Sequence, residues 1–372
     1  MKKKLLSVLL VLCMAASMLL TGCGGQSADE YLGEQITALK EKDTDRFESL
    51  LENELAESMD VNTYTLTFPD ELKEPYLKFL QKAFSSVTFE VASADKKENG
   101  NYSVQVVFTP LDVSKTTNDT NLSYIDSMQG TDLAEEVSAL IKKDEAVIKD
   151  TPEYGEEVTT ELEVKKKGES YSVSDKELEK LIATAVVNGM APYDSVCCVL
   201  DARDYLQSYL DASFKGDFTQ FMKQTDRTEE EAQAWYEGDG IFAPPDDLVP
   251  QYNERCTAAF KNIYKSCKYS VGVPRRKGGA PVSQMYNYTV DVTFSPNNSI
   301  IKASEEFFSR SFYSMEEASA AYVEIFEKYA ASPAYGDETT MTIDLSLSSI
   351  LATQEESGDL YDLCNAICPV PE

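Results

Sequence analysis

NYSVQVVFTP at residues 101–110 returns as NYTVDVTFSP at residues 287–296. Six of the ten positions are identical, and two more exchange serine for threonine. In the first stretch Tyr102, Val104, Val106 and Phe108 recur at every second residue, which is the period of a β-strand that buries one face. We therefore predict a strand in each stretch and expect the chain to hold two copies of one structural unit.

Two further pairs of motifs occur in the same order and extend the repeat. PEYGEEVT at residues 152–159 returns as PAYGDETT at residues 333–340, and Tyr31-Leu32 matches Tyr205-Leu206. The shifts between the copies are 174, 186 and 181 residues, so loop-sized insertions are enough to separate them. This predicts a first repeat over residues 30–188, a linker over residues 189–200 and a second repeat over residues 201–372.

Each repeat is expected to contain the same order of elements. It opens with a helix that carries the Tyr-Leu pair, and a second helix follows a polar break. A third helix is predicted to begin near residues 69–70 or 245–246, where Pro-Asp suits a first helical turn. A hairpin then leads to one further helix, a strand at residues 159–165 or 340–347, and a short final helix. The predicted fold class is α+β, with helices stacked on a small antiparallel sheet in each of two tandem copies.

The N-terminus has the three parts of a secretory signal peptide. A basic start precedes an apolar run over residues 5–20, which is too short for a comfortable transmembrane helix, and small residues follow it. Leu20-Thr21-Gly22-Cys23 resembles the lipobox of bacterial lipoproteins, in which the cysteine thiol receives a diacylglycerol and becomes the mature N-terminus. We predict a signal peptide over residues 1–22, lipidation of Cys23 and a lipidated tether over residues 23–29. The protein would then be held by its lipid on the extracytoplasmic face of the cell membrane.

The whole layout resembles a known kind of protein. Helices followed by a curved antiparallel sheet are similar to the cystatin-like and nuclear transport factor 2-like folds. A lipobox followed by two such copies resembles two-repeat surface lipoproteins of Gram-positive bacteria, a family whose function is uncharacterised. The resemblance covers nearly all of the mature chain, but its motifs are structural and imply no catalytic residues.

Charge narrows the range of partners. The formal net charge is −30, and loss of Lys2, Lys3 and Lys4 with the signal peptide would lower it to −33. A chain this acidic repels phosphate backbones, so we expect no nucleic-acid partner. The basic runs at residues 165–167 and 275–277 are interpreted as solvated hairpin tips, with contact to wall polymer or anionic lipid as the alternative.

The sequence contains no histidine. This removes catalytic triads built on imidazole, histidine-ligated zinc and the commonest general acid or base. Asp, Glu, Tyr or Lys could still do chemistry, so an enzyme is disfavoured without being excluded. We expect no cofactor, no metal and no catalytic residue.

Six cysteines lie in the linker and the second repeat, and they admit three interpretations. An exported protein can form disulfides, and six cysteines allow 15 pairings. The repeat instead aligns three of them with core positions of the first copy, where a cysteine often serves as a small hydrophobe. Zinc is the third interpretation, although adjacent cysteines fit zinc spacing poorly. The candidates are Cys197, Cys198, Cys256, Cys267, Cys364 and Cys368.

Tyr154-Gly155 and Tyr335-Gly336 recur at matching positions of the two repeats. One hypothesis is a ligand site. The other is a turn that opens a strand, with glycine at positive φ and tyrosine packed on the sheet. A motif that is present in two copies of one fold usually serves that fold, so the structural interpretation is favoured.

Three functions remain open. The first is a non-enzymatic module that binds a small molecule or protein in a concavity between helices and sheet, which a large apolar cavity would favour. The second is a structural or assembly role in the cell envelope, which an exposed apolar patch would favour. The third and least favoured is an enzyme built on carboxylates, which two acids facing each other across a cleft would support.

Overall fold

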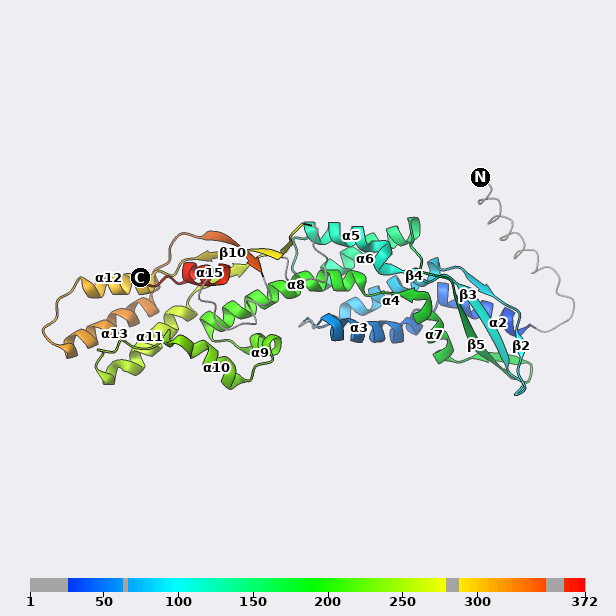
Figure 1. The fold of residues 1–372 in the computed structure, drawn as a ribbon, viewed down its shortest axis with the longest axis horizontal. Coiled ribbons are helices and arrows are strands. Elements are labelled where there is room, and N and C mark those ends of the chain that lie inside the picture. Colours follow the sequence, from blue (N-terminus) through cyan, green and yellow to red (C-terminus); the bar gives the residue numbers. More distant parts are fainter. Residues whose placement is uncertain (1–25, 63–65, 279–287, 346–357, 372) are drawn as a thin grey trace. The chain divides into compact units, whose positions relative to one another are not determined.

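The computed structural model describes residues 26–62, 66–278, 288–345 and 358–371. Over these residues the chain is a mixed α+β protein whose two larger sheets are antiparallel, so the predicted α+β class is confirmed at this level (Figure 1). The chain divides into two compact units. Unit 1 holds residues 26–53, 77–116 and 148–189, and unit 2 holds the remaining described residues.

Unit 1 is built on a sheet with strand order β1-β3-β5-β6, in which β2 also pairs with β3. Strand β3 is central, and Tyr102 pairs with Val164 at one end while Phe108 pairs with Val158 at the other. Alternate residues of β3 are buried, as the period of two predicts. The strands are β1 (Phe89–Val91), β2 (Asp95–Lys96), β3 (Tyr102–Phe108), β5 (Val158–Lys167) and β6 (Ser170–Val173).

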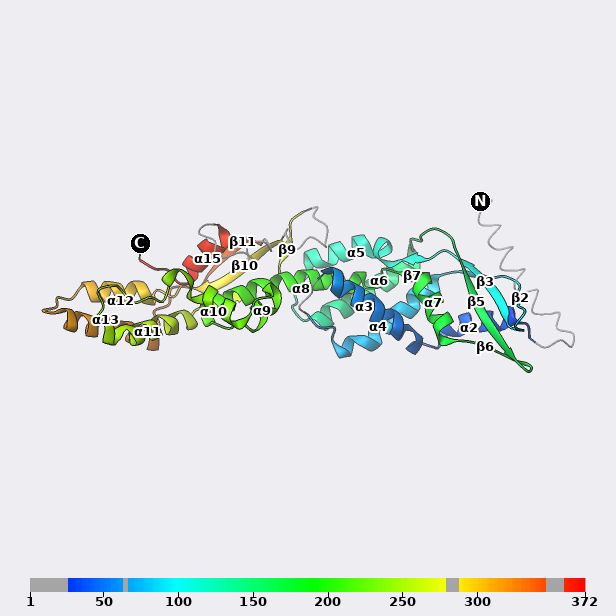
Figure 2. The same ribbon diagram turned by 60° about the horizontal axis from the view of Figure 1, so that its bottom comes forward.

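Helix α2 (Ala28–Glu41) packs on this sheet (Figure 2). A capping box begins it, because Ser27 accepts from the amide of Glu30 and the Glu30 carboxylate accepts from the amide of Ser27. Its apolar side chains recur at helical spacing and are buried. The other elements of unit 1 are η1 (Asp45–Phe47), α7 (Asp175–Ala185) and the parallel pair β4 (Leu111–Asp112) and β7 (Val186–Val187).

Four helices contribute residues to both units. They are α3 (Glu48–Asn62), α4 (Asp70–Ser86), α5 (Val113–Ser127) and α6 (Leu133–Asp150). Their apolar stripes supply much of the core, including Tyr76, Phe79 and Leu140, whose exposed fractions are zero.

Unit 2 carries the second sheet, with strand order β11-β10-β8 and with β9 paired to β10. Its strands are β8 (Lys268–Val271), β9 (Arg275–Arg276), β10 (Tyr288–Ser295) and β11 (Thr339–Leu345). Its helices are α8 (Ala191–Leu210), the π-helical turn η2 (Asp211–Lys215), α9 (Thr219–Thr225), α10 (Glu229–Glu237), η3 (Gly238–Gly240), η4 (Pro250–Tyr252), α11 (Asn253–Lys265), α12 (Ser299–Phe308), α13 (Met315–Ala331) and α15 (Asp359–Ile367).

The two sheets share one pairing pattern. A central strand is flanked by a short preceding strand and a long following strand, as β1-β3-β5 in unit 1 and as β8-β10-β11 in unit 2. The short strands β2 and β9 pair with matching positions, since Lys96 lies opposite Tyr102 and Arg276 lies opposite Tyr288.

Two details of the predicted element order are wrong, and most of the predicted linker is part of a helix. The helix expected near residues 245–246 begins at Asn253, because Pro245 instead forms a turn in which its carbonyl accepts from the amide of Leu248. Two helices, not one, connect each hairpin to its Tyr-Gly motif, namely α5 and α6 or α12 and α13. Residues 191–200, expected as a linker, form the first half of α8, and most of their side chains are buried.

Candidate functional site

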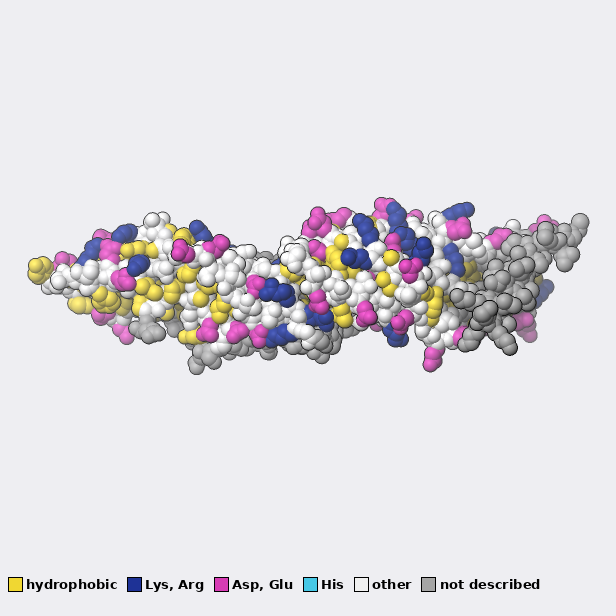
Figure 3. All heavy atoms as spheres, turned by 90° about the horizontal axis from the view of Figure 1, so that it is seen from above, with side chains coloured by type: hydrophobic (Ala, Val, Ile, Leu, Met, Phe, Trp, Pro, Cys, Tyr) yellow, Lys and Arg dark blue, Asp and Glu magenta, His cyan; other side chains and the backbone are white. Residues whose placement is uncertain are grey.

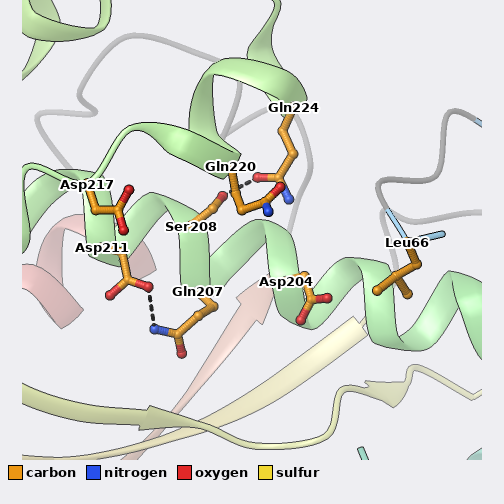
Figure 4. A pocket seen from close by; sticks show the side chains of 8 residues that line it. All are labelled: Leu66, Asp204, Gln207, Ser208, Asp211, Asp217, Gln220 and Gln224. Atoms are coloured by element: carbon orange, nitrogen blue, oxygen red, sulfur yellow. Dashed lines mark hydrogen bonds between the residues drawn. The ribbon is translucent and has the colours of Figure 1, made fainter. Parts of the chain in front are cut away.

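The candidate site is a polar cleft in unit 2 with a volume of about 240 Å³ (Figure 4). Three carboxylates, three amides, one hydroxyl and one leucine line it. The lining residues are Leu66, Asp204, Gln207, Ser208, Asp211, Asp217, Gln220 and Gln224. This cleft is smaller and more polar than the large apolar cavity that would mark an ordinary drug-like ligand site.

Helical spacing explains how these side chains converge. Gln207 and Ser208 come three and four residues after Asp204, and Asp211 comes four and three residues after them, so the four share one face of α8 and the start of η2. Gln220 and Gln224 have the same spacing on α9, which faces them across the cleft in Figure 4. The buried face of α8 carries the Tyr-Leu pair that the sequence identified, and the cleft lies on a polar face of the same helix.

A π-helical turn shapes one end of the cleft. Residues 211–215 form a π-helical turn, whose hydrogen bonds span five residues instead of the four of an α-helix, and Gly216 ends it at a φ of 65°. Such turns occur often at functional sites. Directly after Gly216, Asp217 Oδ1 accepts from the amide of Thr219 at 3.0 Å, which fixes this carboxylate at the N-terminal end of α9.

Asp211 is held by three donors. Its Oδ1 accepts from Lys215 Nζ at 2.6 Å and from the Tyr269 hydroxyl at 2.7 Å, and its Oδ2 accepts from Gln207 Nε2 at 2.9 Å. Burial alone would raise the pKa of Asp211, but these hydrogen bonds outweigh it and the pKa is lowered. Asp211 therefore stays ionised at neutral pH.

Asp204 lies in a different environment on the same face. Burial raises its pKa, and the attraction and hydrogen bond of neighbouring Arg203 oppose that rise. Arg203 Nη2 lies 2.6 Å from Asp204 Oδ1. Further along the helix, the Ser208 hydroxyl donates to the Gln224 side chain and so links α8 to α9.

The cleft is richer in acceptors than in donors. Three carboxylates line it, and Arg203 and Lys215 neutralise part of their negative charge. A carboxylate can accept about four hydrogen bonds. This composition suits a small polar ligand that brings its own donors, above all one with an ammonium group. The cleft was not predicted from the sequence, where its signal is the polar stripe at residues 204, 207, 208 and 211.

A second polar cluster lies among the helices of unit 2. Asp144 on α6 has no exposed surface, and burial raises its pKa to about 8. With its amide turned to donate, Asn121 Nδ2 lies 3.0 and 2.9 Å from the two carboxylate oxygens of Asp144. On α8, burial raises the pKa of Asp194 to about 6 although Ser58 donates to this carboxylate.

The six cysteines considered as disulfide or zinc candidates are all in the thiol form in this structure. Cys197, Cys198, Cys256, Cys267 and Cys368 are buried and Cys364 is partly buried. Burial raises the pKa of Cys256 to about 11 and that of Cys364 to about 12, so these thiols are protonated and poorly nucleophilic at neutral pH.

Cys267, Cys364 and Cys368 gather in one place. A hydrogen bond with Cys267, together with burial, raises the pKa of Cys368. Among the described residues, no group of three or more acidic or cysteine side chains is arranged to hold a metal ion. Whether these thiols form disulfides in the oxidised protein stays a prediction.

In each Tyr-Gly motif the tyrosine hydroxyl forms a hydrogen bond with the C-terminal end of a helix. The Tyr335 hydroxyl donates to the carbonyl oxygen of Ser266 at 2.6 Å, just after α11 ends, and the Tyr154 hydroxyl donates to that of Ser86 at 3.0 Å, where α4 ends. The last carbonyls of a helix lack intrahelical partners, so each tyrosine supplies one. Neither tyrosine is buried, and 40% of the Tyr154 surface is exposed.

The glycines of these motifs do not have the positive φ that was expected of them. Each is positioned instead by an amide hydrogen bond, from Gly155 to the Pro110 carbonyl at 2.9 Å and from Gly336 to the Pro296 carbonyl at 2.8 Å. At Gly336 a Cβ would come within 3.1 Å of the side-chain amide of Asn298. Close approach, not a left-handed turn, is the reason for a glycine there.

Tyr335→Phe is expected to lower the free energy of unfolding by about 1 kcal/mol, because it removes one partly buried hydrogen bond and leaves the ring in place. Lys268 Nζ lies 4.0 Å from the ring centroid and would keep that contact. Tyr154→Phe, in the other Tyr-Gly motif, is the matched control, with a smaller expected loss since Tyr154 is more exposed. Urea denaturation measures both, and a loss of ligand affinity at unchanged stability would contradict the structural interpretation.

Cys23, the predicted lipidation site, lies outside the described residues. Within the described part of the chain, no helix combines the length and the apolar character that crossing a membrane requires.

Comparison with known proteins gave no match, whether to family models, to curated proteins or to solved structures.

Proposed function

We propose that this protein is a lipoprotein anchored to the extracytoplasmic face of the membrane, where it acts as a non-enzymatic binding module. The signal peptide and the lipobox-like Leu20-Thr21-Gly22-Cys23 support the location. The polar cleft supports the binding role, because it brings together acceptors from two helices around a volume that can hold a small ligand.

We further propose that the chain is a tandem duplication of a cystatin-like or nuclear transport factor 2-like domain. The equal pairing pattern of the two sheets supports this, as does the use of Tyr154 and Tyr335 in the same contact with a helix end. Residues 30–188 and 201–372 are the proposed copies.

The proposed ligand of the cleft is a small organic cation. Asp211 and Asp217 present carboxylates whose positions are fixed by hydrogen bonds before any ligand arrives. Such preorganisation reduces the cost of binding, and a charge-assisted hydrogen bond is about twice as strong as a neutral one.

Spermidine is a suitable probe, since its ammonium groups can reach more than one of these carboxylates. Asp217→Asn and Asp204→Asn are each expected to weaken spermidine binding by about tenfold, as the loss of one charged hydrogen bond predicts. Isothermal titration calorimetry measures the affinity, which should also fall as salt rises.

Asp226→Asn is the matched control, because Asp226 is an exposed acid that follows α9 and does not line the cleft. Its affinity for spermidine should equal that of the wild type. If both cleft variants bound spermidine as tightly as the control, the cleft would not be the site.

An assembly role is the second candidate, and one observation favours it. Phe308, Tyr313 and Met315 expose 80%, 97% and 53% of their surfaces on consecutive parts of one helical hairpin. Exposed apolar groups of this kind commonly mark a protein interface. A carboxylate enzyme is the least favoured alternative. It would be supported if the protein showed a turnover that Asp204→Asn abolished without a change in stability.

A further inference from the structure

The turn between α12 and α13 carries an apolar cluster of four aromatic residues and one methionine, here called the aromatic turn: Phe307, Phe308, Phe312, Tyr313 and Met315. Phe308, Tyr313 and Met315 are exposed, and Phe307 and Phe312 are partly buried. The ring of Phe307 stacks on that of Phe312 at 5.0 Å and lies edge-on to Tyr322, also at 5.0 Å. Figure 3 shows hydrophobic side chains gathered over this hairpin. The stacking gives the turn a defined shape, and the exposure leaves its outer rings available to a partner.

Negative charge surrounds the aromatic turn. The nearby cations are held in ion pairs, Lys302 with Glu305 and both Arg310 and Lys328 with Glu306. In the described structure Glu316 instead accepts from Gln251 and Tyr252, which are uncharged. Glu317 accepts from the amide of Tyr313 at 2.9 Å. The partner surface should therefore be apolar with a basic rim, which an anionic bilayer does not offer.

Unit 2 contains a contact in which arginine side chains bind a turn between two helices. The turn between α5 and α6 occupies the equivalent place in the first repeat, and Arg276 of β9 binds Asp126 at its edge through two bonds of 2.8 and 3.1 Å. Arg203 of α8 donates to the carbonyl oxygen of Thr131 in the same turn at 3.2 Å. Met128 of this turn is buried.

Two tyrosines of the second repeat are buried in the same unit. Tyr288, opposite Arg276 in the sheet, has no exposed surface, and only 4% of Tyr205 is exposed. Arg203 and Arg276 of the second repeat thus hold the helical turn of the first repeat.

The first repeat has corresponding residues, with Lys96 in the place of Arg276 and Asp29 in the place of Arg203. Tyr31 and Tyr102 hold the positions of Tyr205 and Tyr288, and both contact Tyr171, with ring centroids 6.1 and 5.7 Å apart. All three are only partly buried. We call these three residues, with the β2–β3 and β5–β6 turns around them, the tyrosine end.

Lysines gather at the rim of the tyrosine end. Because Tyr102 pairs with Val164, the β2–β3 turn and the β5–β6 turn lie at the same end of the sheet. These turns bring Lys96, Lys97, Lys165, Lys166 and Lys167 to that end, together with Asp95, Glu98 and Glu169. Lys97 pairs there with Glu161 at 3.1 Å, and the other four lysines outnumber the remaining acids. Lys166 Nζ lies 5.3 Å from the Tyr171 ring centroid.

We propose that the aromatic turn of one molecule docks on the tyrosine end of a second copy of this chain. The acidic rim of the turn complements the lysines of the tyrosine end, and the contact repeats between molecules the one that α5–α6 makes inside unit 2. The two surfaces differ, so the interface is head-to-tail and can add further molecules.

The test uses the chain from Gly24 onward, which contains every described residue, in sedimentation velocity over a range of concentrations. The wild type is expected to associate in a concentration-dependent series. Phe308→Ser with Tyr313→Ser should weaken association by at least about tenfold, because exposed aromatic anchors carry much of an interface's energy. Tyr361→Ser is the control, since Tyr361 is also an exposed aromatic residue, on α15, and lies outside both surfaces.

A mixing experiment tests the head-to-tail geometry. Lys166→Glu with Lys167→Glu damages the tyrosine end and leaves the aromatic turn intact. This variant and the Phe308/Tyr313 variant should each be monomeric alone, and an equal mixture should form a dimer that grows no further. Lack of this dimer, or larger assemblies in the mixture, would overturn the head-to-tail interface.

Two other results would also overturn the proposal. One is a wild-type chain that stays monomeric at every concentration. The other is binding of the aromatic turn to phosphatidylcholine vesicles, lost in the Phe308/Tyr313 variant, without self-association in solution. The spermidine experiment on the cleft uses other residues, so its outcome is independent of this one.

Discussion

Asp144→Asn is expected to raise the free energy of unfolding by about 3 to 5 kcal/mol at pH 8.5 and to change it little at pH 4. Asp144 is fully buried on α6, and burial raises its pKa to about 8. In the unfolded chain the pKa of an aspartate is about 3.9. The folded state therefore binds the proton more tightly than the unfolded state does.

The sign of the pH dependence follows from this difference. Below about pH 4 the carboxyl is protonated in both states and costs little. As the pH rises from about 4 to 8, the unfolded chain ionises while the folded chain resists, so stability falls; above about 8 the full penalty is present. Asparagine has nearly the same shape, can pair with the Asn121 amide and carries no charge at any of these pH values.

Urea denaturation at pH 4, 6, 7 and 8.5 measures this effect. Asp119→Asn is the control, because Asp119 is exposed on α5, and it should follow the wild-type pH profile. Asp194, whose pKa is raised to about 6, should add a smaller dependence of the same sign in all three proteins. Parallel profiles for the wild type and Asp144→Asn would show that Asp144 is ionised and compensated in the folded chain.

The sequence predicted those parts of the fold that depend on local periodicity. The alternation in residues 101–110 and 287–296 predicts strands β3 and β10, and the repeated motifs predict that each is followed by a second long strand. The helix boundaries were harder to predict from the sequence. A short break at residues 128–132 divides α5 from α6, and Pro192 stands at the start of α8 instead of ending a linker.

The cleft and the buried acid differ in what the sequence could reveal. The polar stripe of α8 looks like any solvated helix face, and only the approach of α9 turns it into a cleft. Asp144, in contrast, falls on the apolar stripe of Val137, Leu140, Ile141 and Ile148, so helical spacing alone places it among core residues. A charged residue at such a position is a detectable signal.

Cys23→Ser is expected to move the protein from the membrane to the aqueous phase. Serine has no thiol to accept a diacylglycerol, and each buried CH₂ of an acyl chain contributes about 0.8 kcal/mol, so two long chains hold a protein firmly and their loss removes nearly all of the attachment. Detergent phase partition, with acyl labelling, measures the change. Cys13→Ser is the control, because Cys13 lies in the apolar run that signal cleavage would remove.

The tether makes the prediction sharper. Only four residues, Gly24 to Ser27, separate the predicted anchor from the first residue of α2. At about 3.5 Å per extended residue, the start of α2 can lie no more than roughly 18 Å from the Cα atom of Cys23. In the wild type a protease that cleaves within residues 24–27 should therefore be hindered by the bilayer, and in Cys23→Ser it should not. A mature N-terminus at any residue other than Cys23 would contradict both expectations.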